Sequence, residues 1–251
     1  MNRMKGFSRR PLFSVDAEGY GRSHPRRQHW MQDAIHHVLS QAAVEVGFEQ
    51  EGWQTQLAGD SAFSVLGADE SEPVLVDDFV RHLDSGLRDV NDGREAGARL
   101  RLRAAFHYGV AVPARGGFSD RGAVETARIL DCGPLREALR LSPAAVLATA
   151  VSREVFHTVI GGAYTTLRAE EFREFQVRSK EFDDAVWIRV LGGDVHALTL
   201  ASGDEPPGAP APAPARADAP AQPTVPGQHS EMVFEAPVHG PVIGIMNQYR
   251  P

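Results

Sequence analysis

A proline cluster near the C-terminus sets the limit on how much of this chain can fold. Eight of the 17 prolines lie between Pro206 and Pro226, interleaved with alanine. Such a segment buries too little apolar surface to offset the conformational entropy that it loses on ordering. We therefore expect residues 196–229 to form an extended, disordered linker, with a folded region before it and a short apolar segment behind it.

The composition is that of a soluble globular protein. Hydrophobic residues make up 42% of the chain, and the formal net charge of −7 argues against a nucleic-acid partner. The single cysteine excludes an intramolecular disulfide and fits a reducing compartment. No apolar run has signal-peptide character or approaches the roughly 18 residues that span a bilayer. We predict a cytoplasmic protein without a membrane partner, in which residues 1–10 are flexible and residues 11–195 form the domain.

Hydrophobic periods in residues 11–195 alternate between those of strands and those of helices. Strand-like patterns occupy residues 12–16, 53–66 (a hairpin), 100–107, 145–151, and 172–177 with 185–190 (a second hairpin). Helical patterns occupy residues 26–46, 71–90, 122–131, 134–141 and 152–160. In residues 100–107, four apolar residues alternate with Arg101, Arg103 and His107, which predicts a strand with one buried face. The order predicts an α+β fold with a ferredoxin-like βαββαβ core, additional helices and a closing β-hairpin.

Two acidic residues stand where exposed strand ends would hold them. Asp16 closes the first strand in FSVDAEGYG, and Asp60 is at the hairpin tip in QLAGDSAF. In a ferredoxin-like sheet the first strand lies beside that hairpin, so we expect the two carboxylates to converge. Hard oxygen ligands suit Mg²⁺ or Mn²⁺, and two such ions can clamp an in-line phosphoryl displacement. The alternative interpretation is that both aspartates are ordinary turn residues.

Five segments, in this order, resemble those of the class III adenylate/guanylate cyclase family: FSVDAEGYG, LAGDSAFSVL, LRLRAAFHYGVAV, ARILDC and VRSKEFDDAVWIRV. The resemblance covers residues 11–190. It implies the fold of that family and conversion of a nucleoside triphosphate to a 3′,5′-cyclic nucleotide and pyrophosphate, with Mg²⁺ or Mn²⁺ as cofactor. It also implies a signalling role and a head-to-tail homodimer with sites between the chains.

The resemblance assigns roles to individual residues of this sequence. Asp16 and Asp60 match the two metal-binding aspartates, and the main-chain carbonyl of Ala17 matches a further metal contact. Arg128 matches the arginine that stabilises charge on the transferring phosphate, although it also fits an ordinary charge on a helix surface. The residues that match substrate-binding positions are Gln56, Asp120 and Lys180.

Two departures from the family pattern leave the activity open. Gln56 stands where the family has a base-reading lysine, and its neutral amide both donates and accepts hydrogen bonds, so the base is not implied. Where the family has its transition-state asparagine, this chain has Val124 followed by Glu125. Losing one such hydrogen bond typically lowers a rate by about 10²–10³. The two hypotheses are a divergent cyclase and a weak or inactive cyclase-like module that binds nucleotide or dimerises and recruits partners.

The C-terminal residues 230–251 become apolar again after the linker. Their core is similar to amyloid-signalling homotypic interaction motifs, and it comprises Gly240, Val242, Ile243, Gly244 and Ile245. A short, neutral, β-branched stretch at a tethered end is typical of a cross-β segment. We predict an interaction motif for homotypic or heterotypic partners; the alternative is a strand that docks on the domain.

Overall fold

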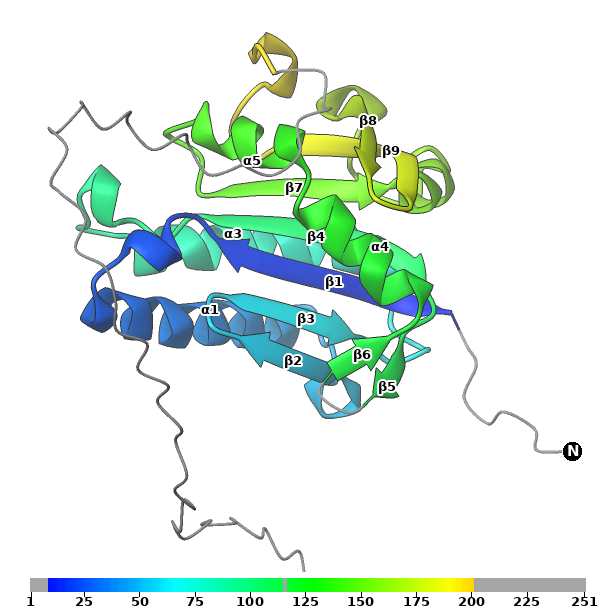
Figure 1. The fold of residues 1–251 in the computed structure, drawn as a ribbon, viewed down its shortest axis with the longest axis horizontal. Helices are drawn as coiled ribbons and strands as arrows, with labels where there is room; N and C mark the ends of the chain where they lie inside the picture. Colours follow the sequence, from blue (N-terminus) through cyan, green and yellow to red (C-terminus); the bar gives the residue numbers. More distant parts are fainter. Residues whose placement is uncertain (1–8, 115–116, 201–251) are drawn as a thin grey trace, which may run out of the picture. The chain divides into compact units, whose positions relative to one another are not determined.

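The computed structural model describes residues 9–114 and 117–200, which form an α+β domain around a seven-stranded mixed sheet (Figure 1). The strands of this sheet are β1 (Arg10–Ala17), β2 (Gln54–Ala58), β3 (Ser61–Val65), β4 (Leu102–Gly109), β7 (Leu147–Ser152), β8 (Arg173–Ser179) and β9 (Phe182–Val190). A small separate hairpin pairs β5 (Val112–Ala114) with β6 (Gly117–Ser119). The helices are α1 (Pro25–Glu45), α2 (Glu72–Val76), α3 (Asp78–Val90), α4 (Arg121–Leu130), α5 (Gly133–Arg140) and α6 (Arg153–Val155).

The strand order β2-β3-β1-β4-β7-β9-β8 contains the predicted ferredoxin-like core. Strand β1 pairs antiparallel with both β3 and β4, and β2 pairs antiparallel with β3. With α1 after β1 and α3 after β3, these elements give the βαββαβ order with all four strands antiparallel. Strand β7 then adds parallel to β4, and the β8–β9 hairpin closes the sheet. The predicted fold class is confirmed.

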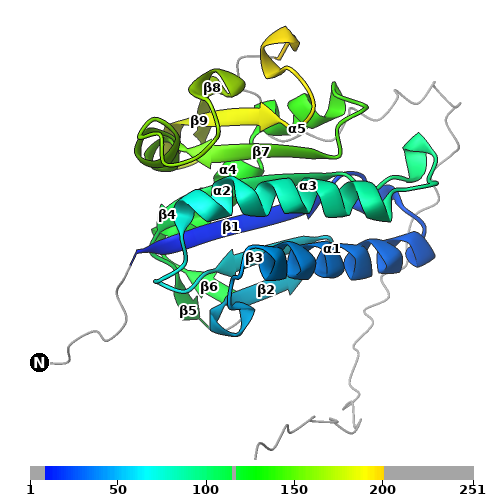
Figure 2. The ribbon, with the colours of Figure 1, turned by 180° about the vertical axis from the view of Figure 1, so that it is seen from behind.

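Helices cover both faces of the sheet. Helices α4 and α5 lie in front of it in Figure 1, and the view from behind in Figure 2 shows α1 and α3 on the opposite face. Two separate clusters of buried apolar side chains result: one is centred on Phe13, Met31 and Phe79, and the other on Ile129 and Leu135. Because side chains alternate along a strand, the central strands β4 and β7 and their neighbour β9 supply residues to both clusters.

Helix α1 forms where its apolar spacing predicts. Pro25 occupies the first helical position, where its missing N–H costs nothing, and the imidazole of His24 accepts a hydrogen bond from the main-chain N–H of Arg26 at 3.3 Å. The buried residues recur at helical spacing, and they are Met31, Ala34, Ile35, Val38, Leu39, Ala42 and Ala43. This stripe packs the helix against the sheet.

The single helix predicted for residues 71–90 is wrong in one respect, because it breaks into α2 and α3 at Asp77. The Asp77 backbone has φ −112° and ψ −80°, outside the helical region. Its carboxylate is 5% exposed and accepts hydrogen bonds from the main-chain N–H and the hydroxyl of Thr166, at 2.7 and 2.8 Å. This bond to a residue 89 positions away is a tertiary interaction that local pattern does not encode.

Strand β4 differs from its prediction because both of its faces are covered. Arg101 and Arg103 are 14% and 11% exposed, since α4 and α5 lie over the face that they share. Arg101 donates to the main-chain carbonyls of Leu139, Ser142 and Ala145, and so ties β4 to the end of α5. Within the described residues, no helix is both long and apolar enough to cross a membrane.

Candidate functional site

Asp16 and Asp60 lie at adjoining strand ends. Asp16 is the penultimate residue of β1 and stands opposite Ser61, the first residue of β3. Asp60 precedes Ser61 in the β2–β3 turn, and its main-chain carbonyl accepts a hydrogen bond from the N–H of Ala17 at 3.2 Å. The turn is tight because Gly59 adopts a φ of 63°, a conformation that glycine adopts readily. The main chains of Asp16, Ala17 and Asp60 therefore lie side by side where the ends of β1 and β3 adjoin, a place that we call the aspartate corner.

Asp16 does not stand alone at this corner. Arg103 of β4 lies directly across from it in the strand register, on the face that α4 covers, and the guanidinium forms an ion pair with the Asp16 carboxylate. The two side chains are 11% and 19% exposed. Burial, together with the charge of Arg136, lowers the pKa of Arg103 from its usual value. The sequence pattern does not single out Arg103, because a charged residue that alternates with apolar ones in a strand indicates a solvent-facing position.

Asp60 has a different environment from Asp16. Burial raises the pKa of the Asp60 carboxyl above its ordinary value of 3.8. No ion pair of Asp60 is found within the described ranges, so its charge is desolvated without a compensating cation there. A nearby divalent cation would supply that compensation, and carboxylate and carbonyl oxygens are the ligands that Mg²⁺ and Mn²⁺ prefer. The donor set of Asp16, Asp60 and Ala17 fits such a cation.

The donor set is nevertheless small. Among the residues that the structure describes, no group of three or more His, Cys, Asp and Glu side chains is placed to hold a metal ion. A cation at this corner would therefore complete its shell with water or with oxygens of a bound ligand, as Mg²⁺ usually does.

Gln56 lies on the same face of the sheet as Asp16. Gln56 is opposite Phe63 in the β2–β3 pair, and Phe63 is opposite Ser14 in the β3–β1 pair, which places all three in one row. Ser14 and Asp16 are two residues apart on β1 and so face the same side. The Phe63 ring also contacts Phe118 of β6, with centroids 5.1 Å apart, so the small hairpin packs beside this row.

The other three predicted site residues are dispersed in the single chain. Helix α4 begins beside the C-terminal end of β4, where the Gly122 N–H donates to the Val110 carbonyl at 2.9 Å. Asp120 is the N-cap at that end, whereas Arg128 is in the last turn of α4. The Nε atom of Arg128 is buried and lacks a hydrogen-bond partner in the described structure. Lys180 is exposed in the β8–β9 turn, next to the far edge strand of the sheet, with a φ of 56°.

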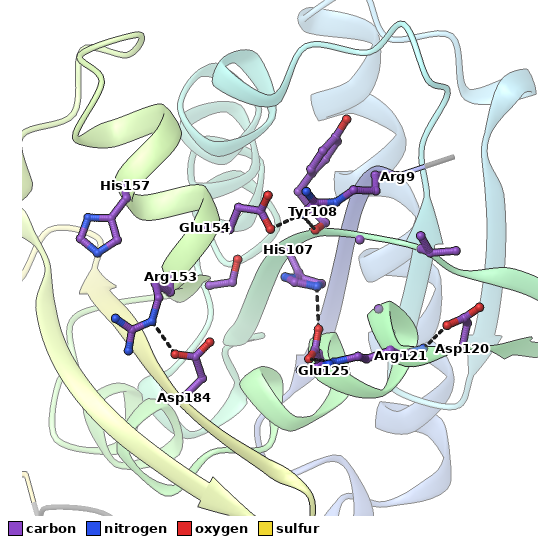
Figure 3. A pocket seen from close by; sticks show the side chains of 14 residues that line it. Arg9, His107, Tyr108, Asp120, Arg121, Glu125, Arg153, Glu154, His157 and Asp184 are labelled. Atoms are coloured by element: carbon purple, nitrogen blue, oxygen red, sulfur yellow. Dashed lines mark hydrogen bonds and ion pairs between the residues drawn. The ribbon is translucent and has the colours of Figure 1, made fainter. Parts of the chain in front are cut away.

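A crevice of about 710 Å³ opens at the C-terminal ends of the parallel strands β4 and β7 (Figure 3). The chain leaves β4 toward one face of the sheet, into α4, and leaves β7 toward the other, into α6, which is the arrangement that opens crevices in such sheets. In the β1–β4 pair, Arg10 stands opposite Gly109 at the crevice end, and Asp16 stands opposite Arg103 at the aspartate corner. At a rise of about 3.4 Å per residue, the crevice and the aspartate corner are about 20 Å apart.

The arginines that line the crevice are paired with carboxylates, as Figure 3 shows: Arg9 with Glu154, Arg121 with Glu125, and Arg153 with Asp184.

His107 also lines the crevice and contacts Glu125, with 3.1 Å between Nε2 and the carboxylate. Burial lowers the pKa of His107 below 6.5, although Glu125 opposes the shift.

The predicted interaction residues Gly240, Val242, Ile243, Gly244 and Ile245, and residues 201–229 of the predicted linker, lie outside the described residues. Residues 196–200, at the start of the predicted linker, are described, and Leu200 is buried.

Comparisons with known proteins give matches only at the level of solved structures. No family model matches the chain, and neither does any curated protein. The guanylyl cyclase Cya2 aligns with a TM-score of 0.49 and 16% identity, over 78% of this chain and 98% of that one. An adenylate/guanylate cyclase/hydrolase from Silicibacter pomeroyi gives 0.49 and 15%, over 72% and 96%. Adenylate cyclases from Trypanosoma brucei, in their monomeric state, give 0.49 and 12%, over 78% and 92%.

Proposed function

We propose that this chain is a divergent nucleotide cyclase-like signalling protein that converts a nucleoside triphosphate to a 3′,5′-cyclic monophosphate and pyrophosphate. The observation that carries the proposal is the corner where Asp16 and Asp60 meet, joined by the hydrogen bond from the Ala17 N–H to the Asp60 carbonyl at 3.2 Å. A domain that only scaffolds other proteins has no need of two acidic residues on adjoining strand ends, whereas a site that neutralises the charge of a triphosphate through a bound cation does.

In the proposed reaction, the ribose 3′-hydroxyl oxygen bonds to the α-phosphorus, the bond from that phosphorus to the bridging oxygen breaks, and pyrophosphate leaves. The hydroxyl proton passes to solvent. Asp16, Asp60 and the Ala17 carbonyl would hold Mg²⁺ or Mn²⁺, which supplies neutralisation of phosphate charge when bound. Arg128 would bind a phosphate oxygen, because its guanidinium has a buried Nε without a partner in the described structure.

The proposed active assembly is a homodimer with sites between the chains. In a single chain, Asp120 and Lys180 lie far from the aspartate corner, at the crevice and at the far edge of the sheet. A head-to-tail pair would bring these residues of one copy to the aspartates of the other. The exposed Val124 on α4, 50% accessible, offers apolar surface on the helix that would face the partner.

A second candidate function is a cyclase-like module that binds nucleotide or dimerises with little turnover. It is favoured by the segment where the family has its asparagine, because this chain has Val124 followed by Glu125 there. Glu125 accepts from Arg121 at 2.6 Å and contacts His107 at 3.1 Å, so its carboxylate is engaged at the crevice. Glu125 therefore does not replace the hydrogen-bond donor that the family's asparagine supplies in the transition state, since an ionised carboxylate only accepts hydrogen bonds.

The test is an incubation of the full chain with each of the four nucleoside triphosphates and Mn²⁺, followed by mass spectrometry for cyclic product. We expect product from the wild type, loss of product in Asp60→Ala, and wild-type product in the exposed control Asp69→Ala. Product that persists in Asp60→Ala would be contamination and would remove the enzyme hypothesis. Nucleotide binding without any product would support the second candidate.

For residues 230–251, we propose an assembly role that this incubation does not address. A peptide of these residues is expected to form thioflavin-positive fibrils because of its neutral, β-branched core. A peptide that stays monomeric at high concentration would contradict this role.

A further inference from the structure

The ion pair between Asp16 and Arg103 occupies a carboxylate that the proposed function needs. The register of β1 and β4 places the two residues directly opposite each other, so strand pairing and not a flexible loop sets their contact. Both side chains are largely buried, at 19% and 11% exposed, so water and salt screen the attraction far less than at an open surface. The pair is therefore a fixed part of the corner.

Arg103 has Asp16 as its only ion-pair partner among the described residues. Its Nη1 atom is buried and has no hydrogen-bond partner in the described structure, and the neighbouring cation of Arg136 further disfavours its charge. Asp131 and the Cys132 thiol oppose these effects without forming an ion pair with it. A buried guanidinium cannot shed its proton in proteins, so it retains Asp16 unless another anion replaces that carboxylate.

The two carboxylates of the corner are thus unequal. Asp16 is already neutralised by a cation of the protein itself, whereas Asp60 has no ion pair in the described part of the chain. A divalent ion that binds both carboxylates therefore competes with Arg103 for the negative charge of Asp16.

We propose that Arg103 is a built-in competitor of divalent cations at Asp16, which keeps the metal affinity of the corner low until an anion takes the guanidinium. This inference rests on the proposed function, because it takes Asp16 and Asp60 as the cation ligands. Linkage makes the effect reciprocal: an anion that binds Arg103 releases Asp16 and raises cation affinity, and a bound cation raises the affinity for the anion by the same factor. The corner would then load its cation and a phosphate-bearing ligand together and not separately.

The test measures Mn²⁺ binding by the full chain without nucleotide, from the loss of the free-ion signal in electron paramagnetic resonance at pH 8. Arg103→Met removes the competing charge at similar volume, and we expect the Mn²⁺ Kd to fall at least tenfold. Asp16→Asn should weaken binding in the wild type. The matched control is Arg189→Met, because Arg189 is also buried, at 16% exposed, and pairs with Glu171 at 2.9 Å, but it lies on β9.

The outcomes separate this inference from the proposed function. If Asp16→Asn weakens binding but Arg103→Met leaves it unchanged or weaker, competition by Arg103 is wrong and the cation site stands. If neither the wild type nor Arg103→Met binds Mn²⁺, the proposed cation site fails and the competition with it. Circular dichroism checks that each variant is folded; should Arg103→Met unfold, Arg103→Gln replaces it with the same expectation.

Discussion

Replacing each aspartate of the corner by asparagine is expected to change stability in different directions. Asp16→Asn leaves the Arg103 guanidinium buried without its carboxylate, in a pair whose side chains are 11% and 19% exposed. Removing one partner of a buried pair costs about 3–5 kcal/mol, and the amide oxygen of asparagine retains part of the hydrogen bonding, so we expect about 2–3 kcal/mol. In a domain of this size 1 kcal/mol shifts Tm by about 2–4 °C, which gives a fall of about 4–12 °C.

Asp60→Asn is expected to leave Tm unchanged or raise it slightly, because burial already disfavours the ionised carboxylate and raises its pKa above 3.8. The folded state therefore binds the carboxyl proton of Asp60 more tightly than the unfolded state does. It follows that the wild type loses stability relative to Asp60→Asn as pH rises through and above that value. Asparagine removes this dependence because it does not titrate.

The assay is thermal unfolding of the full chain by circular dichroism at pH 4 and pH 7, with EDTA present so that no cation contributes. An Asp16→Asn variant that melts with the wild type at pH 7 would refute the buried pair. A fall in the Tm of Asp60→Asn as large as that of Asp16→Asn would refute the difference between the two carboxylates.

Three further outcomes follow from the packing. Gly122→Ala should destabilise the fold by about 1–3 kcal/mol in urea unfolding, because its new Cβ would lie 2.8 Å from the Val110 nitrogen, whereas Gly133→Ala, which meets nothing within 4 Å, should not. In an NMR titration, His107 should titrate below 6.5, because burial lowers its pKa; a value at or above 6.5 would show that Glu125 dominates. Cys132 should resist a thiol reagent at pH 8 until the protein unfolds, because burial raises its pKa to about 11.

Local pattern was sufficient to predict the elements that carry the aspartates. The apolar run before Asp16, the turn chemistry around Gly59 and the helical stripe of α1 are each encoded within a few residues. The order of these elements then predicts that β1 lies beside the β2–β3 hairpin, and so predicts that Asp16 and Asp60 are neighbours in the sheet. What local pattern did not predict is the role of residues whose partners are remote in sequence.

Arg103 and Asp77 illustrate that limit. An arginine that alternates with apolar residues indicates a strand with one solvent-exposed face. In β4 that face is buried, because helices pack over it. Asp77 interrupts a strong helical pattern because its carboxylate bonds Thr166. Both are polar groups satisfied across the fold, so their signals are tertiary.

The long interval between Asp16 and Arg103 also bears on how the domain folds. The two residues are 87 positions apart, and their contact forms only when β4 has docked along β1. Closing so large a loop is slow compared with forming the α1 helix or the β2–β3 turn, which are local. The chain must therefore form most of its ferredoxin-like half before Asp16 and Arg103 can pair. Until then Asp16 is an ordinary hydrated carboxylate.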